Sequence, residues 1–186
     1  DRNILRDGGT YSYNTEQKWL DYFSGTQSHN TIQFDDRDQM PRLSRFLFGD
    51  WLKASGLEDI KEEDGKTNFG AGYVCRRGIS HHRKLSLSSS SLKVVDEVKG
   101  FNRKAELRWR LAPGKWELVE GDGGVQTRSK DFPGFSLTIS SNVPYVRCRL
   151  KEGWESLHYF EKTPLPVLEL ETAVSCKLTT EIRWKN

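Results

Sequence analysis

Most of the sequence after residue 65 alternates between apolar and polar residues with a period of two. This alternation is typical of β-strands with one buried face, because successive side chains point to opposite faces of a sheet. The segment 107–111, Leu-Arg-Trp-Arg-Leu, predicts a strand with its apolar residues in the core and Arg108 and Arg110 facing out. The same pattern predicts buried faces formed by Leu85 and Leu87, by Trp116 and Leu118, by Phe135, Leu137 and Ile139, by Val146, Cys148 and Leu150, and by Leu178, Thr180, Ile182 and Trp184.

Turn-forming sequences rich in Gly, Pro, Asn and Asp separate these strands, at 112–114, 121–124, 131–134 and 141–144. This spacing favours an all-β fold, a large antiparallel β-sandwich. The serine-rich run 86–91 is predicted to be a hairpin turn, and 16–22 to form about two turns of helix. The polar segment Leu57 to Glu63 is expected to be a loop. A chain of this length predicts a single domain over residues 1–186.

The composition, with 35% hydrophobic and 30% charged residues, fits a sheet with one solvated face. The net charge of +3 permits contact with an acidic polymer without requiring it. The three widely spaced cysteines predict free, buried thiols rather than a disulfide framework. No apolar run approaches the roughly 18 residues of a membrane span, and no phosphate-binding loop or nucleophile elbow is present. We therefore expect neither a membrane span nor a nucleic-acid partner.

The first 40 residues carry a more specific pattern. It reads Asp-Gly-Gly-Thr-Tyr-Ser-Tyr from Asp7, a Tyr-Phe pair at 22–23, His-Asn-Thr from His29, and Asp-Asp-Arg-Asp-Gln at 35–39. These elements, in this order, resemble the heparinase II/III-like family of polysaccharide lyases. Looser landmarks, such as Trp-Glu-Ser-Leu-His-Tyr at 154–159, extend the resemblance over nearly the whole chain.

The resemblance implies a C-terminal β-sandwich that follows an α-helical toroid. Family members cleave uronic-acid-containing chains by β-elimination: a base removes the C5 proton, the carboxylate stabilises the enolate, and an acid protonates the departing O4. The toroid, and a Gly-His-Ala-Asp-like motif expected just before Asp7, are absent from this sequence. The resemblance thus predicts a fragment of a longer, periplasmic or secreted lyase, inactive by itself, with an acidic polysaccharide as substrate and the toroid as partner.

Asp7 and His29 are the first candidate site residues. In some family members the matching residues join an upstream His in holding a structural zinc, and a carboxylate with imidazoles is a reasonable zinc ligand set. The resemblance therefore implies zinc in the intact protein only. From the residues alone, Asp7 equally fits the start of a Gly-Gly turn, and His29 a loop hydrogen bond.

Four residues are candidates for substrate binding. Tyr11 and Tyr13 are expected on one face of a strand, where they would stack on a sugar ring or fill the core. Arg37 would neutralise a uronate or sulfate, or lie in a solvated turn. His82 belongs to a basic cluster that could grip an acidic glycan, although His81 should point to the opposite face.

Two further interpretations remain open. The chain could be a stand-alone carbohydrate-binding module that uses exposed aromatic residues and the faces carrying Arg108, Arg110, Arg147 and Arg149. It could also be a structural β-sandwich that mediates contact between protein subunits. His158, near Trp154 and Tyr159, is expected to be a packed residue rather than a catalyst.

Overall fold

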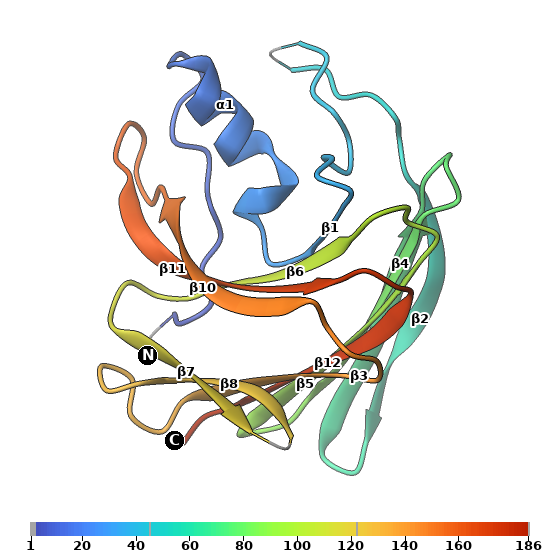
Figure 1. Ribbon diagram of the computed structural model, residues 1–186, viewed down its shortest axis with the longest axis vertical. Coiled ribbons are helices and arrows are strands. Elements are labelled where there is room, and N and C mark those ends of the chain that lie inside the picture. The colour runs from blue at the N-terminus through green and yellow to red at the C-terminus, as the bar shows by residue number, and fades with distance from the viewer. Residues whose placement is uncertain (1–2, 45, 122, 186) are drawn as a thin grey trace. The chain divides into compact units, whose positions relative to one another are not determined.

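The structure, a computed structural model, describes residues 3–44, 46–121 and 123–185 (Figure 1). The chain forms two compact units that interleave along the sequence. The four-stranded unit comprises Asp1–Trp51, Asn102–Gly114 and Val146–Ala173. The eight-stranded unit comprises Leu52–Phe101, Lys115–Tyr145 and Val174–Asn186. Both sheets are antiparallel, which confirms the all-β, sandwich-like fold class; the assignment of a single domain stays a prediction.

The sheet of the four-stranded unit has the order β1-β6-β11-β10. Its strands are β1 (Ile32–Phe34), β6 (Ala105–Arg110), β10 (Arg147–Glu155) and β11 (Thr163–Thr172). Leu107 on β6 pairs with both Ile32 and Leu170, so alternation brings the apolar residues of three strands together. All three side chains are fully buried.

One helix and one helical turn belong to this unit, α1 (Gln17–Ser24) and the 3-10 helix η1 (Thr26–Ser28). The helix predicted at 16–22 is therefore confirmed, with its bounds shifted by one or two residues. It lies on one side of the sheet (Figure 1), where the Tyr22 hydroxyl accepts a hydrogen bond from Trp154 N on β10 at 2.7 Å. No helix among the described residues is long and apolar enough to cross a bilayer.

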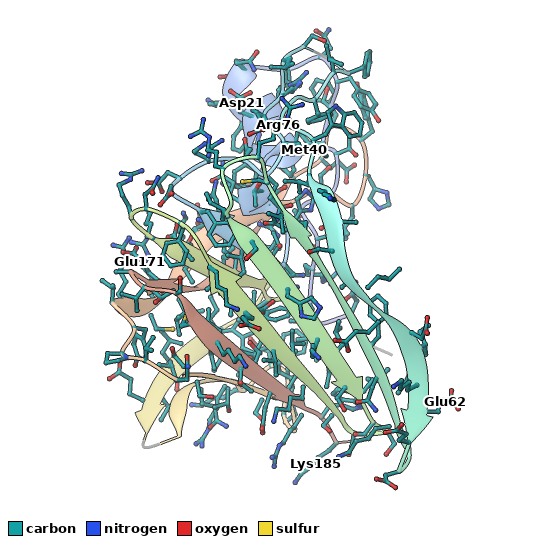
Figure 2. The ribbon with its side chains drawn as sticks, turned by 90° about the vertical axis from the view of Figure 1, so that its right-hand side faces the viewer. Asp21, Met40, Glu62, Arg76, Glu171 and Lys185 are labelled. Carbon is teal, nitrogen blue, oxygen red and sulfur yellow. The ribbon has the colours of Figure 1, made fainter. Side chains whose placement is uncertain are left out.

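The sheet of the eight-stranded unit has the order β2-β3-β4-β5-β12-β9-β8-β7. Its strands are β2 (Lys53–Glu63), β3 (Lys66–Val74), β4 (Ser80–Leu87), β5 (Ser91–Lys99), β7 (Trp116–Gly121), β8 (Gly124–Ser129), β9 (Ser136–Ser141) and β12 (Cys176–Arg183). As predicted, Phe135, Leu137, Ile139, Leu178 and Ile182 lie in its core. The hairpins β2–β3 and β4–β5 turn at the same end of the sheet, where Figure 2 labels Glu62 and Lys185.

Several predictions about strands are wrong. Leu87 and Val146 are not buried, because Leu87 ends β4 and Val146 precedes β10, and their side chains are 46% and 57% exposed. Leu57 to Glu63 is not a loop, because it forms most of β2, an edge strand paired with β3 through two register shifts. Arg108 and Arg110 do not face solvent, because both guanidinium groups are buried and paired. The cysteine prediction is confirmed in part: all three thiols are free, but only Cys176 is buried.

A buried charge network explains how β6 tolerates its arginines. Arg108 donates to Glu169 at 2.8 Å, to Glu106 at 2.9 Å and to Gln33 at 2.7 Å. Glu169 also accepts hydrogen bonds from Arg149. Buried charges persist in proteins when they are paired and hydrogen-bonded, so these cross-strand pairs compensate for the lost hydration.

Candidate functional site

Asp7 and His29 are brought together in the four-stranded unit. His29 Nδ1 donates to Asp7 Oδ2 at 2.7 Å, and the other carboxylate oxygen accepts Gly9 N–H at 2.9 Å. The hydrogen bond from His29 lowers the pKa of Asp7; burial opposes this, and Gly9 N–H and the charge of Arg110 add to it. With Nδ1 as donor, His29 keeps Nε2 available as a base or a metal ligand, the arrangement in which a carboxylate orients an imidazole.

A ring of hydrogen bonds holds the backbone around this pair. Asn30 donates to Arg6 O at 2.9 Å and accepts from Arg110 N at 2.7 Å. The fully buried Arg110 guanidinium donates to the Tyr22 hydroxyl at 3.1 Å and to Trp154 O. These contacts tie the segment containing His29 to β6, α1 and β10, so the position of the imidazole is set by the sheet rather than by a free loop.

The sequence signalled part of this ring. The sequence identifies the Tyr-Phe pair and the His-Asn-Thr segment as family landmarks, but nothing in it connects them to Arg110. Alternation gives the correct face of β6 for Arg110, but it does not show that this face is covered, because the covering residue Tyr22 is 88 positions away.

A zinc site is incomplete among the described residues. Asp7 and His29 supply two donors, and no group of three His, Cys, Asp or Glu residues in the described part of the chain has metal-binding geometry. Structural zinc takes four ligands as a rule, so this pair alone does not fit the ion. Zinc stays a prediction for a longer protein that supplies further ligands.

Tyr11 and Tyr13 do not share a face, and the segment is not a strand. Tyr11 has a positive φ of 59°, which breaks the alternation. Its ring is buried and stacks on Phe23 at 5.2 Å, whereas Tyr13 is 53% exposed. Of the two uses foreseen for these rings, core filling therefore holds for Tyr11, and Tyr13 is free to contact a ligand or a partner.

Tyr13 is part of an exposed aromatic surface, which we define as Tyr13, Phe46, Tyr159 and Phe160. Ring centroids of Tyr13 lie 6.0 Å from Phe46 and 6.3 Å from Tyr159. Phe160, like Tyr11, has a positive φ, and its N–H bonds Tyr11 O at 2.8 Å. Non-glycine residues in this conformation cost free energy and concentrate at functional positions.

The other predicted residues lie apart from the Asp7–His29 pair in their contacts. Arg37 is half-buried and pairs with Asp50 at 3.4 Å. His82 belongs to the eight-stranded unit, where Nε2 contacts Gly56 O at 2.8 Å. As predicted, His81 points to the opposite face, where it is buried against Asp96. His158 is exposed, so its expected packing among aromatic residues is wrong.

Comparisons with known proteins address the chain as a whole. Residues 1–185 match the family model described as heparinase II/III-like, C-terminal. None of the curated protein sequences matches the chain.

Solved structures share the fold. A heparinase III gene product aligns with a TM-score of 0.78 at 16% identity, over 98% of this chain and 28% of that chain. The heparan sulfate lyase from Pedobacter heparinus aligns with a TM-score of 0.76 at 16% identity, over 100% and 29%. Another heparinase III structure gives a TM-score of 0.73 at 19% identity, over 100% and 28%. The chain thus spans less than a third of these solved chains.

Proposed function

Because the chain belongs to the heparinase II/III-like family and corresponds to its C-terminal part, we propose that it is the sheet domain of a polysaccharide lyase. Its parent protein would cleave uronic-acid-containing glycans by β-elimination and would carry a helical domain before this chain. One observation carries the proposal. The structural alignments cover nearly all of this chain but only 28–29% of the heparinase III and heparan sulfate lyase chains. A secreted or periplasmic location belongs to the same proposal.

The four-stranded unit supplies the residues for one wall of a cleft. Elimination needs groups that move a proton within hydrogen-bond reach of the sugar. His29, with Asp7 on Nδ1 and Nε2 without a partner among the described residues, is a group of this kind. We propose that this pair faces the cleft and that the helical domain supplies the remaining acid and base groups.

The exposed aromatic surface is the second observation in favour of a partner domain. Its four side chains are each 53–74% exposed, although such residues favour burial. The backbone has a positive φ at Phe160, a member of this surface, and at Tyr11, whose ring contacts Phe160. We propose that the helical domain covers this surface, which would bury rings that the chain by itself leaves in water.

Association with the separately produced helical domain tests this arrangement. The double variant Tyr13→Ser, Phe46→Ser removes two exposed aromatic side chains that lie against each other and should weaken association about tenfold or more. The control Leu57→Ser, Ile60→Ser removes two exposed apolar side chains from β2 and should leave association unchanged. Equal effects of the two double variants, measured by analytical ultracentrifugation, would contradict a specific interface.

A further inference from the structure

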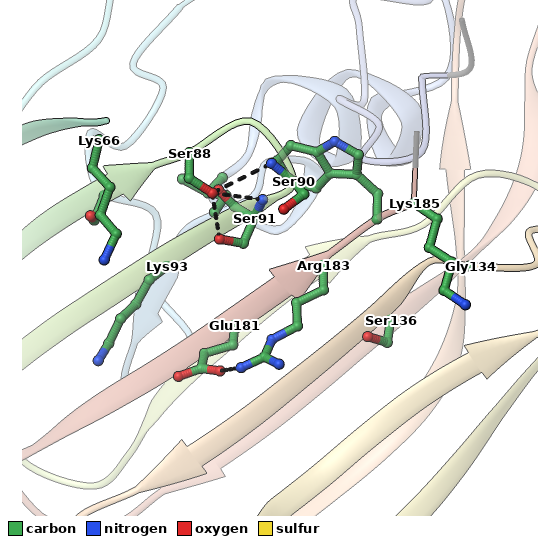
Figure 3. Close-up of a pocket in the computed structure, with 13 residues that line it drawn as sticks. Lys66, Ser88, Ser90, Ser91, Lys93, Gly134, Ser136, Glu181, Arg183 and Lys185 are labelled. Carbon is green, nitrogen blue, oxygen red and sulfur yellow. Dashed lines mark hydrogen bonds and ion pairs between the residues drawn. The ribbon is translucent and has the colours of Figure 1, made fainter. Parts of the chain in front are cut away.

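A pocket of about 670 Å³ lies in the eight-stranded unit (Figure 3). This volume is within the range of about 300–1,000 Å³ that small-molecule sites occupy. All of its lining residues come from one unit, so its geometry is internal to that unit. The central ones are Lys93, Ser136, Glu181, Arg183, Trp184 and Lys185.

The register of β12 with its two neighbouring strands brings the charged lining residues of this pocket together. Glu181 and Arg183 are two positions apart on β12, so they share a face, and they pair with Lys93 and Ser91 on β5. On the other side of β12, Arg183 pairs with Ser136 of β9. Figure 3 shows these side chains standing on the same face of the sheet. The buried residues Leu178, Thr180 and Ile182 alternate with them along β12, so the pocket occupies the polar face.

The end of the chain closes one side of the pocket. Trp184 N donates to Ser90 O of the β4–β5 hairpin at 3.1 Å, and Lys185 N donates to Gly134 O at 3.1 Å. Two backbone bonds in succession thus hold Trp184 and Lys185 between two turns of the sheet. The half-buried indole and the lysine are fixed as part of the pocket.

The charge of the pocket favours an anion. Lys66, Lys93, Arg183 and Lys185 line it against one carboxylate, Glu181. Glu181 bonds Arg183 at 3.1 Å in an exposed pair, and such pairs contribute little and exchange readily. Lys66, Lys93 and Lys185 form no ion pair with any described residue, so their ammonium groups are available. A guanidinium and ammonium groups together match carboxylate or sulfate oxygens.

The uncharged residues narrow the class of anion. Five serine hydroxyls line the pocket, and those of Ser86 and Ser136 have no hydrogen-bond partner among the described residues. Hydroxyls both donate and accept, as the hydroxyls of a sugar do. The indole of Trp184 offers an apolar face for the C–H groups of a pyranose ring. An inorganic anion would use the cations and the hydroxyl donors, and it would leave the indole without a role.

We propose that this pocket binds an acidic saccharide, with its carboxylate or sulfate groups at Lys93, Arg183 and Lys185 and a ring against Trp184. The proposal does not rest on the lyase proposal, because the pocket uses only residues of the eight-stranded unit. If the chain binds saccharide in this pocket but its parent protein shows no elimination activity, the pocket proposal stands and the lyase proposal fails.

Titration calorimetry with two probes tests the site: a sulfated heparin tetrasaccharide and an unsulfated oligouronate of equal length. We expect the double variant Lys93→Ala, Arg183→Ala to raise the Kd by at least about tenfold for whichever probe binds, since charge-assisted hydrogen bonds are lost. The matched control is Lys177→Ala, which removes an exposed cation on the same face of β12, six residues from Arg183 and outside the pocket. It should change the Kd less than about twofold.

Tryptophan fluorescence supplies a second readout. Saccharide binding should change the emission of the chain, and Trp184→Phe should remove that change while the far-UV circular dichroism stays the same. If only the sulfated tetrasaccharide binds, sulfate is the recognised group. If both probes bind, the carboxylate is the recognised group. No binding of either probe, or equal losses in the Lys177→Ala control, would overturn the proposal. Equal affinity for a single-stranded oligonucleotide of matched charge would overturn the saccharide assignment.

Discussion

Asp7 Oδ2 accepts a hydrogen bond from His29 Nδ1 at 2.7 Å, across 22 positions of sequence. Because the carboxylate accepts a hydrogen bond from Nδ1–H, the neutral imidazole keeps its proton on Nδ1 and its lone pair on Nε2. The pair therefore fixes the tautomer in which His29 can act on a substrate or a metal.

Asp7→Ala should shift the tautomer equilibrium of the His29 imidazole. The Nδ1–H form loses its acceptor, so the share of Nε2–H imidazole at His29 should rise. Imidazole nitrogen shifts measured by NMR at a pH where His29 is neutral report the change directly. The ring signals of the exposed His158 serve as an internal control, and an unaltered His29 spectrum in the variant would show that Asp7 does not set the tautomer.

Glu169 makes the four-stranded unit sensitive to acid. Burial raises the pKa of Glu169, but the charge and hydrogen bond of Arg108, with Lys151 and Arg149, outweigh it and hold the pKa at about 2. A folded-state pKa below the unfolded value gives stability that is complete above pH 4.5 or so and is lost as the pH falls toward 2. The free energy of unfolding should thus fall by about 2–3 kcal/mol over this range from this group.

Glu169→Gln should remove that part of the pH dependence. The variant should be less stable at pH 7 by about 2–3 kcal/mol, since a neutral amide leaves the buried Arg108 with one carboxylate partner, Glu106, instead of two. Urea unfolding between pH 2 and pH 7 measures both effects. Glu117→Gln, at an exposed position on β7, is the control and should follow the unmodified chain; identical curves for the two variants would refute the role of Glu169.

Asp96 is a buried, paired carboxylate in the eight-stranded unit, as Glu169 is in the four-stranded unit. Its carboxylate is fully buried and bonds His81 Nε2 at 2.6 Å and Arg83 Nε at 2.6 Å. Burial raises the pKa of Asp96, but the His81 bond and the charge of Arg83 outweigh it and lower the pKa overall. Asp96→Asn should destabilise the chain by about 3–5 kcal/mol, since it removes one side of a buried charge pair.

The matched control for Asp96 is Asp59→Asn, at an exposed position on β2 of the same sheet. It should change the free energy of unfolding by less than about 0.5 kcal/mol. Thermal and urea unfolding compare the two variants. A loss for Asp96→Asn no greater than that for Asp59→Asn would show that the buried cluster carries no stability.

Alternation in the sequence predicted the strands that bury apolar residues, and it failed where burial does not follow polarity. β9 and β12 were predicted because Leu137, Ile139 and Ile182 recur at every second position. β2 was missed because nearly all its side chains are exposed, and its backbone is held by pairing with β3 instead. Arg108 was placed in solvent because its compensating partner, Glu169, is 61 positions away.

The sequence predicts only part of the candidate site, because local patterns do not report tertiary contacts. The residue pattern named Asp7 and His29, and the fold brings them into contact. It did not reveal the positive φ at Tyr11, because that conformation depends on tertiary contacts with Phe160 and Phe23. The pocket around Arg183 is not visible in the sequence, since it joins five strands whose order no local pattern states.

The most direct test of the lyase proposal is a comparison of three samples on a uronic-acid-containing glycan, followed by absorbance of the unsaturated uronate product. The samples are this chain, the helical domain of the parent protein, and the two combined or fused. The account predicts product only when both parts are present, with a large loss for His29→Ala and little for His158→Ala. Unsaturated product from this chain alone, or full activity of the helical domain without it, would contradict the account.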